Sequence, residues 1–286
     1  MSDAGSESAA AAFCAELVRN HDFDRYAATL FVDPASRRAL LALYAFNVEI
    51  VRVREQVSLP LPGELRLQWW SDMLAGTSHG GVEGNPVAVE LQRAIKSHAL
   101  PVAPLARLIE AHLFDLYNDP MPSLTALETH LDDTVATLFA LAAQILGQRS
   151  PLIDHAARHA GLAQGIAQVI ANLPFDSARR QLFVPLQVLQ SHGSGEAEAY
   201  AGTETPTLRT ALNELCGTAQ THLDAALTLL ADIPAAARPA FLPLALVRRD
   251  LARLGRADTK LFAPYQRSRL ATLWTLWRGS RSRVFR

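Results

Sequence analysis

Charged side chains interrupt an otherwise apolar stretch at residues 35–57, which reads ASRRALLALYAFNVEIVRVREQV. Apolar residues on more than one side predict a helix buried deep in a bundle. Glu49, Arg52, Arg54 and Glu55 then need explaining, because an unpaired buried charge is costly. They either pair with one another along a solvent-facing edge or form a polar patch at the mouth of a bundle cavity.

A second stretch, residues 161–185, reads GLAQGIAQVIANLPFDSARRQLFVP. Its small residues would let another helix or a ligand approach closely. Gln164 and Gln168 lie four apart on one predicted helical face, and Asn172 continues that face. Pro174 predicts that the helix ends near residue 171, which would turn Asp176 away from the other polar side chains. The stretch is either one wall of a polar site or a tightly packed core helix.

Two further spacings have a chemical interpretation. Asp115 and Asp119 form an Asp-x-x-x-Asp pair just before Pro120. Carboxylates are unfavourable at the C-terminal end of a helix, so this pair either has a cationic partner or lies in a solvated turn. His155 and His159 lie four apart on a predicted helix, but the motif supplies no third zinc ligand, which favours a solvated face.

The elements that must position these residues are predicted to be helices throughout. Apolar residues recur at spacings of three and four, and the alternation typical of strands is missing. Gly- and Ser-rich loops are predicted at residues 76–86 and 191–206. The predicted helices are 7–19, 24–31, 35–57, 63–75, 86–98, 102–117, 123–146, 151–171, 206–231, 236–254 and 265–278.

The 286-residue chain has a net charge of −1 that conceals an asymmetry. Seven basic residues and no acidic residue follow Asp258, so the remainder has 20 basic and 28 acidic residues, a balance of −8. An acidic body argues against nucleic-acid binding, whereas a basic end favours an anionic surface. The two cysteines are too few for a disulfide framework, which is typical of a reducing cytoplasm.

The C-terminal segment combines apolar and basic residues at helical spacing. This pattern suits either an anionic lipid interface or partner, or a last helix docked on the bundle. We therefore divide the chain into a flexible N-terminal segment with a lead helix (1–22), a main domain (23–264) and a basic amphipathic helix and tail (265–286). The candidate membrane or partner residues are Arg267, Arg269, Leu270, Leu273, Trp274, Trp277 and Arg278.

The sequence ALYAF at 42–46 and the block at 161–185 resemble squalene and phytoene synthases. The resemblance implies an all-α isoprenoid synthase fold with a central apolar cavity. It also implies condensation of two prenyl diphosphates, with magnesium held by two aspartate-rich motifs. Such motifs have a physical reason, because hard divalent cations with oxygen ligands neutralise a diphosphate.

The sequence departs from the family at these motifs. The two aspartates of the first motif fall on Val51 and Glu55, and those of the second on Asn172 and Asp176. The glutamate within the second motif falls on Phe175. One principal carboxylate is therefore missing from each pair, and metal affinity depends on ligand number and charge.

Four blocks resemble a divergent branch of this family more specifically. They are AFNVEIVRVREQVS at 45–58, LRLQWWSDM at 65–73, AQGIAQVIANLP at 163–174 and SARRQLFVP at 177–185. The known member of that branch is a mitochondrial assembly factor for respiratory complex I that also lacks the aspartate pairs. The resemblance implies a catalytically degenerate protein that acts by binding in the assembly of NADH:ubiquinone oxidoreductase. Its implied partners are complex I subunits or other assembly factors and a prenyl or lipid-like ligand, and no cofactor is expected.

Two alternatives remain open. The first is an active magnesium-dependent prenyl transferase with altered metal ligation, and the second is a peripheral membrane or partner-docking protein. The expected location is the cytoplasm, with peripheral contact at the inner face of the cytoplasmic membrane. The candidate cavity residues are Tyr44, Arg52, Glu55, Gln164, Gln168 and Asn172, and the candidate metal ligands are Glu55, Asp176, Asp115 and Asp119.

Overall fold

The computed structural model describes residues 2–77, 80–263, 265 and 267–286. Within these ranges the chain is helical and has no strand, as the periodicity predicts. The boundary at Pro264 and part of the loop at 76–86 fall outside them. The α-helices are α1 (Ser2–His21), α2 (Phe23–Thr29), α3 (Pro34–Val51), α4 (Val53–Gln56), α5 (Pro60–Ala75), α6 (Pro86–His98), α7 (Val102–Ala111), α8 (Leu124–Leu131), α9 (Thr137–Ile145), α10 (Pro151–Ala178), α11 (Leu186–Ser191), α12 (Glu196–Tyr200), α13 (Pro206–Leu229), α14 (Leu244–Leu254) and α15 (Arg269–Ser280).

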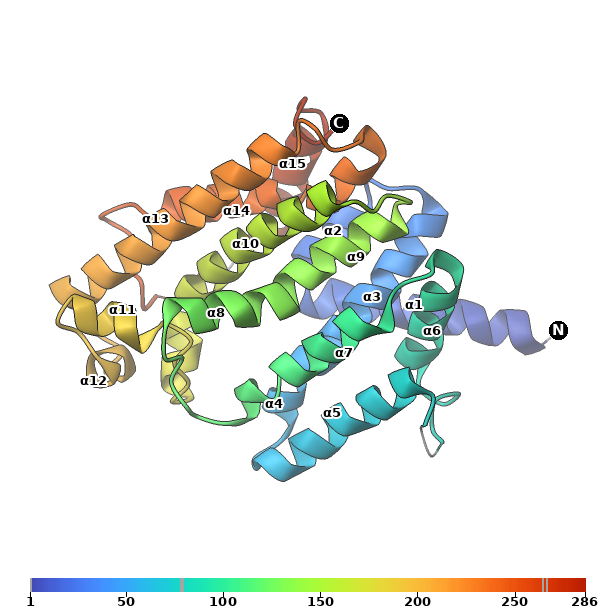
Figure 1. The fold of residues 1–286 in the computed structure, drawn as a ribbon, viewed down its shortest axis with the longest axis horizontal. Coiled ribbons are helices and arrows are strands. Elements are labelled where there is room, and N and C mark those ends of the chain that lie inside the picture. Colours follow the sequence, from blue (N-terminus) through green and yellow to red (C-terminus); the bar gives the residue numbers. More distant parts are fainter. Residues whose placement is uncertain (1, 78–79, 264, 266) are drawn as a thin grey trace.

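The longest helix, α10, forms the centre of the bundle. It packs against α13, α9, α8 and α14, and Figure 1 shows α8 and α9 end to end, running alongside α10 and α13. Helix α3 packs on the other side of the core against α1, α6 and α9. Phe46 of α3 and Phe241 are fully buried, and Phe241 stacks on Phe139 at 5.7 Å between ring centroids.

Many helices begin where a capping side chain precedes a proline. A proline fits the first turn because its missing amide would have no helical partner there. The side-chain oxygen of the capping residue accepts hydrogen bonds from first-turn backbone N–H groups that have no acceptor within the helix. This arrangement opens α3, α6, α10 and α13, with Asp33, Asn85, Ser150 and Thr205 as the caps.

The prediction that Pro174 ends its helix near residue 171 is wrong. Helix α10 continues through Pro174 to Ala178. Leu173 and Ser177 on either side are buried, and burial of this turn against the core offsets the cost of an internal proline. The Asp176 carbonyl accepts hydrogen bonds from the backbone amides of Arg179 at 3.0 Å and Gln181 at 2.9 Å, and the helix ends there.

Four predicted helices are divided in the structure. The predicted helix 35–57 is divided into α3 and α4, and the predicted helix 236–254 into a 3₁₀ helix (η3, Ala235–Phe241) and α14. The predicted helix 102–117 ends at Ala111, and a separate 3₁₀ turn (η1, Phe114–Leu116) follows. The predicted helix 123–146 contains a π-helical segment (η2, Asp132–Ala136) between α8 and α9. Such π segments are rare in proteins, and those that occur are frequently found at functional sites. The interruptions at η1 and η2 both lie beside the cavity described below.

Helix α1 docks onto α3 and α6. It forms the lead helix of the expected N-terminal segment. No helix in the described ranges is long and apolar enough to cross a membrane.

Candidate functional site

A cavity of about 420 Å³ lies between the α3–α4 region, the α7–η1 turn, α8–η2 and α10. Its walls mix charged, amide and apolar side chains, whereas the resemblance implies an apolar cavity. The lining residues used below are Asp22, Arg25, Val51, Arg52, Arg54, Glu55, His112, Asp115, His130, Gln168, Asn172, Asp176, Arg179, Gln181 and Phe183.

Helix α10 supplies one polar wall of the cavity. Gln168, Asn172 and Asp176 are four residues apart and all line it, because the helix continues past Pro174. Arg52 and Glu55 line the opposite wall near the junction of α3 and α4. Arg54, the next charged residue of the first stretch, lines the cavity as well, so the structure brings together six of the polar residues singled out in the two stretches.

Three of the candidate residues lie elsewhere. Tyr44 is buried behind Arg25, whose guanidinium carbon lies 5.7 Å from the tyrosine ring centre. Burial raises the pKa of Tyr44 to about 12. Gln164 lines a smaller neighbouring cavity, and Asp119 is exposed outside the main one. Asp115 and Asp119 share no helical face, because only Phe114–Leu116 is helical there.

Most carboxylates that line the cavity have their own partners. Asp22 bonds Arg25 at 2.6 Å, and Arg179 donates to Glu55 at 3.3 Å. The remaining two, Asp115 and Asp176, are described below.

The magnesium cluster that the resemblance implies does not fit these side chains. Val51 offers no ligand, Asn172 offers a neutral amide oxygen, and the Arg179 cation lies beside Glu55. Burial raises the pKa of Asp176 to about 7, against a smaller opposing effect of Arg179. A diphosphate–magnesium complex needs several charged oxygens, and this rim does not present them together.

The raised pKa of Asp176 predicts a pH-dependent stability. The folded state holds the Asp176 proton to about pH 7, whereas the unfolded state releases it near pH 4. The contribution of this group to stability is therefore lost as the pH rises through that window. We expect Asp176→Asn to be nearly neutral near pH 4 and stabilising by up to about 4 kcal/mol near pH 8, because a pKa difference of about 3 corresponds to about 4 kcal/mol.

Urea denaturation at both pH values measures this difference. Asp119→Asn, which removes an exposed carboxylate outside the cavity, is the matched control and should change stability by less than about 0.5 kcal/mol at either pH. Equal effects of the Asp176 substitution at the two pH values would contradict the assignment.

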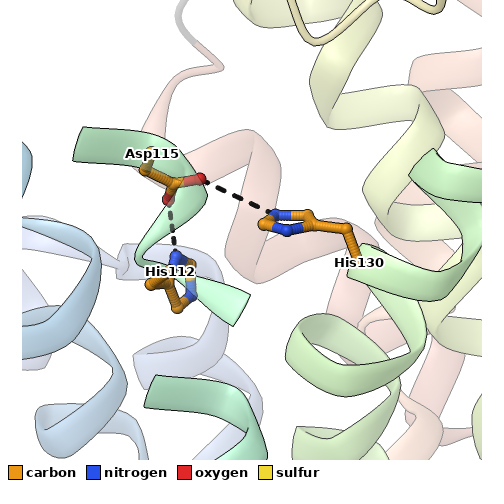
Figure 2. Close-up of side chains that lie close together, drawn as sticks. All are labelled: His112, Asp115 and His130. Atoms are coloured by element: carbon orange, nitrogen blue, oxygen red, sulfur yellow. Dashed lines mark hydrogen bonds and ion pairs between the residues drawn. The ribbon is translucent and has the colours of Figure 1, made fainter. Parts of the chain in front are cut away.

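Two histidines and an aspartate converge at the cavity wall (Figure 2). His112 Nδ1 lies 2.6 Å from Asp115 Oδ2, and His130 Nε2 lies 3.9 Å from Asp115 Oδ1. Burial lowers the pKa of His130, although Asp115 opposes the effect. Within the described ranges, this is the only group of three such side chains whose ligand atoms all lie within 4.8 Å of one another.

Backbone interactions fix the position of this group. His112 follows the last turn of α7, and Asp115 lies in η1. The Gln181 side-chain amide donates to the Asp115 carbonyl at 2.8 Å, which ties η1 to the end of α10. His130 comes from α8 and lies against Phe114 and Phe183, with centroid distances of 6.0 and 6.2 Å.

Sequence reasoning missed His112 and His130. They are 18 residues apart with a turn between them, so no motif joins them. The sequence does offer one signal for this group. His112 and Asp115 are three residues apart, and residues at that spacing approach one another on a helix.

A second histidine cluster lies outside this cavity. His159 contacts His155 at 3.2 Å between Nε2 atoms and His222 at 2.8 Å between Nδ1 atoms. Glu128 lies 3.6 Å from His222 Nε2. The structure thus adds a third imidazole and a carboxylate to the pair that the sequence suggested, and burial lowers the pKa of both His159 and His222.

Helix α15 separates the C-terminal candidates into two groups. Thr272 and Leu276 are buried against the bundle and Leu273 is partly buried. This face of α15 corresponds to the alternative of a last helix docked on the bundle. Leu270, Trp274 and Trp277 are exposed by 80%, 59% and 38%. Arg269 and Arg278 are exposed, although the Arg269 guanidinium lies over the Phe23 ring.

Arg267 is not part of that exposed surface. Its side chain is 8% exposed and bonds Asp24 at 2.8 Å and also Asp250. The sequence placed it with the membrane or partner residues, but its guanidinium ties the C-terminal segment to α2 and α14. Pairing with two carboxylates explains why this arginine is buried.

Comparison with known proteins supports the same fold. A rat protein named NADH dehydrogenase (ubiquinone) complex I, assembly factor 6 is 32% identical over 252 residues, which cover 88% of this chain and 76% of that protein. Squalene synthase HpnC from Alicyclobacillus acidocaldarius superimposes with a TM-score of 0.74 at 21% identity, covering 87% of this chain and 95% of the synthase. A dehydrosqualene synthase superimposes with a TM-score of 0.83 at 13% identity, covering 96% of both chains. The sequence model of squalene/phytoene synthase matches residues 18–278, and the chain therefore belongs to the squalene/phytoene synthase family.

Proposed function

We propose that this chain acts by binding in the assembly of respiratory complex I and does not transfer prenyl groups. The similarity to proteins named complex I assembly factor 6, over 88% of the chain, carries this proposal. The composition of the cavity supports it, because the two positions that would complete the aspartate pairs hold Val51 and Asn172. We propose that neither magnesium nor another cofactor is needed for this role.

The retained cavity supports a binding role. Its polar walls and volume of about 420 Å³ suit a ligand or a peptide side chain held by arginine and amide groups. Complex I subunits or other assembly factors are the proposed protein partners, and a prenyl or lipid-like molecule is the proposed small ligand.

Deleting the gene in the source organism tests the assembly role. We expect a loss of inhibitor-sensitive NADH:ubiquinone oxidoreductase activity and of assembled complex I on native gels. The wild-type chain and Glu55→Gln should both restore the complex, since the proposal assigns no metal to Glu55. Normal complex I together with a missing isoprenoid hydrocarbon would overturn the proposal.

Purified protein tests the absence of prenyl transfer directly. With magnesium and farnesyl or geranylgeranyl diphosphate, we expect no release of pyrophosphate above the protein-free rate. Turnover that disappears in Glu55→Gln would favour the prenyl transferase alternative.

We also propose that the exposed face of α15 contacts an anionic membrane surface. Leu270 and Trp274 expose apolar area, and Trp277 stacks on Trp274 with 4.9 Å between centroids. Arg278 and Arg281 lie beside them, and the Arg281 guanidinium lies 4.2 Å from the Trp277 ring centre. Exposed tryptophan beside arginine suits the interface of a bilayer with anionic headgroups.

Vesicle flotation tests this surface. We expect the chain to float with phosphatidylcholine vesicles only when they contain phosphatidylglycerol, and less at high salt. The double variant Leu270→Ala/Trp274→Ala should lose most of the binding. Leu61→Ala/Leu65→Ala, which removes two similarly exposed leucines from α5, should keep it. Equal binding by both variants would exclude α15 as the contact surface.

A further inference from the structure

We infer that His112, Asp115 and His130 form a binding site for one divalent transition-metal ion of the zinc type. The site differs from the two aspartate-motif positions of the family in its residues and in its ligand chemistry. It stands independently of the role in complex I assembly, because it rests on the geometry of three side chains.

The distances are close to those of a coordinated metal. In a tetrahedral zinc site with bonds of about 2.0–2.1 Å, neighbouring ligand atoms lie about 3.3 Å apart. The Asp115 carboxylate is 2.6 Å from the His112 ring and 3.9 Å from the His130 ring. These two contacts use different oxygens of the carboxylate, and one donor atom from each of the three residues lies within 4.8 Å of the others. Side-chain rotations that bring the three donors to about 3.3 Å from one another would complete three positions of such a site.

The orientation of the side chains also fits a shared ion. Figure 2 shows the Asp115 carboxylate between the two imidazole rings, with one oxygen directed toward each. The His112 and His130 rings approach edge to face, with centroids 5.8 Å apart. Three elements thus direct nitrogen and oxygen donors at one point in the cavity wall.

One ligand atom of the group has no hydrogen-bond partner. Asp115 Oδ1 is buried and accepts no hydrogen bond, although His130 Nε2 lies 3.9 Å from it. The His112 side chain is only 9% exposed, so bulk water does not solvate it freely. A buried polar atom without a partner costs free energy, and a metal ion bound to the carboxylate and imidazoles would remove part of that cost.

The donor set selects the class of metal. Two imidazole nitrogens and one carboxylate oxygen suit zinc and its first-row neighbours, whereas magnesium prefers oxygen donors and water. All three residues line the cavity, so an ion could enter from it and keep a coordination position open toward it. The Gln181 hydrogen bond to the Asp115 carbonyl holds the carboxylate in place without occupying its oxygens.

Cobalt titration of the chelator-stripped full chain tests the inference. Co²⁺ reports nitrogen and oxygen coordination through its visible absorption, and Zn²⁺ should displace it. We expect one Co²⁺ per chain at this site. His130→Gln and Asp115→Asn should each weaken binding by about tenfold or more, while His159→Gln should leave it unchanged.

The choice of control separates this site from the second histidine cluster. His159 is the central member of that cluster and contacts no residue of the proposed site in the hydrogen-bond network. Loss of Co²⁺ binding in His159→Gln but not in His130→Gln would overturn the assignment. Absence of binding by the wild-type chain would also overturn it and leave a hydrogen-bonded His–Asp–His group.

A measurement on the wild-type chain covers the case in which a variant fails to fold. Diethyl pyrocarbonate modifies accessible imidazole nitrogens, and peptide mass spectrometry identifies each histidine. Bound Zn²⁺ should slow modification of His130 by about tenfold while His98, which lies outside the cavity, reacts at an unchanged rate. Equal rates at His130 with and without Zn²⁺ would contradict the proposal.

Discussion

Replacing Arg38 by methionine is expected to destabilise the protein by about 3–5 kcal/mol. Arg38 of α3 donates to both carboxylate oxygens of Glu90 in α6, at 2.7 and 2.6 Å. The Glu90 side chain is only 2% exposed, so the substitution leaves its charge buried without a partner. Urea denaturation followed by circular dichroism measures the change in the free energy of unfolding.

Two further variants show whether the effect comes from the stranded charge. Arg93→Met breaks an exposed ion pair with Glu7 and should change stability far less than Arg38→Met, because solvent screens that pair. Arg38→Met/Glu90→Met removes both charges and should recover most of the loss, because an apolar pair can replace a buried ion pair. If the double variant is as unstable as Arg38→Met, the loss of stability comes from lost packing of the arginine side chain and not from the unpaired Glu90 charge.

The substitution Gly161→Ala is expected to destabilise the protein by about 1–3 kcal/mol. A Cβ atom at Gly161 of α10 would lie 2.4 Å from both the Cα and the backbone nitrogen of Ala136. That contact is with backbone, so no side-chain rotation relieves it. Because Ala136 ends the π-helical segment, the clash would also push η2 away from α10. Thermal and urea denaturation measure the loss.

Gly217→Ala is the matched control for this substitution. Gly217 lies within α13, and a Cβ atom there meets nothing within 4 Å. Alanine is a better helix former than glycine, so this variant should gain about 0.5–1 kcal/mol. Destabilisation by both substitutions would mean that close packing on Ala136 is not the cause.

The helical fold was predictable because its signals are local. Apolar spacing identified the long helices, and prolines behind capping residues marked the starts of α3, α6, α10 and α13. Of the predicted face of Gln164, Gln168 and Asn172, the last two line the main cavity, whereas Gln164 lines the smaller neighbouring one. The resemblance to squalene and phytoene synthases supplied the arrangement of these helices, which periodicity alone does not determine.

The remaining features depend on contacts between distant residues. Pro174 lies within α10 between Leu173 and Ser177, which are buried in the core, and their burial cannot be read from the local sequence. His112 and His130 meet only because the chain turns at η1 and returns through α8. Arg267 has a basic amphipathic context in sequence, but its partners Asp24 and Asp250 lie far along the chain.

The contact between Arg179 and Glu55 also limits what a few substitutions can do to cation binding in the cavity. Aspartates in place of Val51 and Asn172 would complete both acidic pairs, yet a guanidinium would still lie 3.3 Å from Glu55. Asp176 would still favour its proton near neutrality. A magnesium-binding variant of this chain would therefore need several substitutions made together.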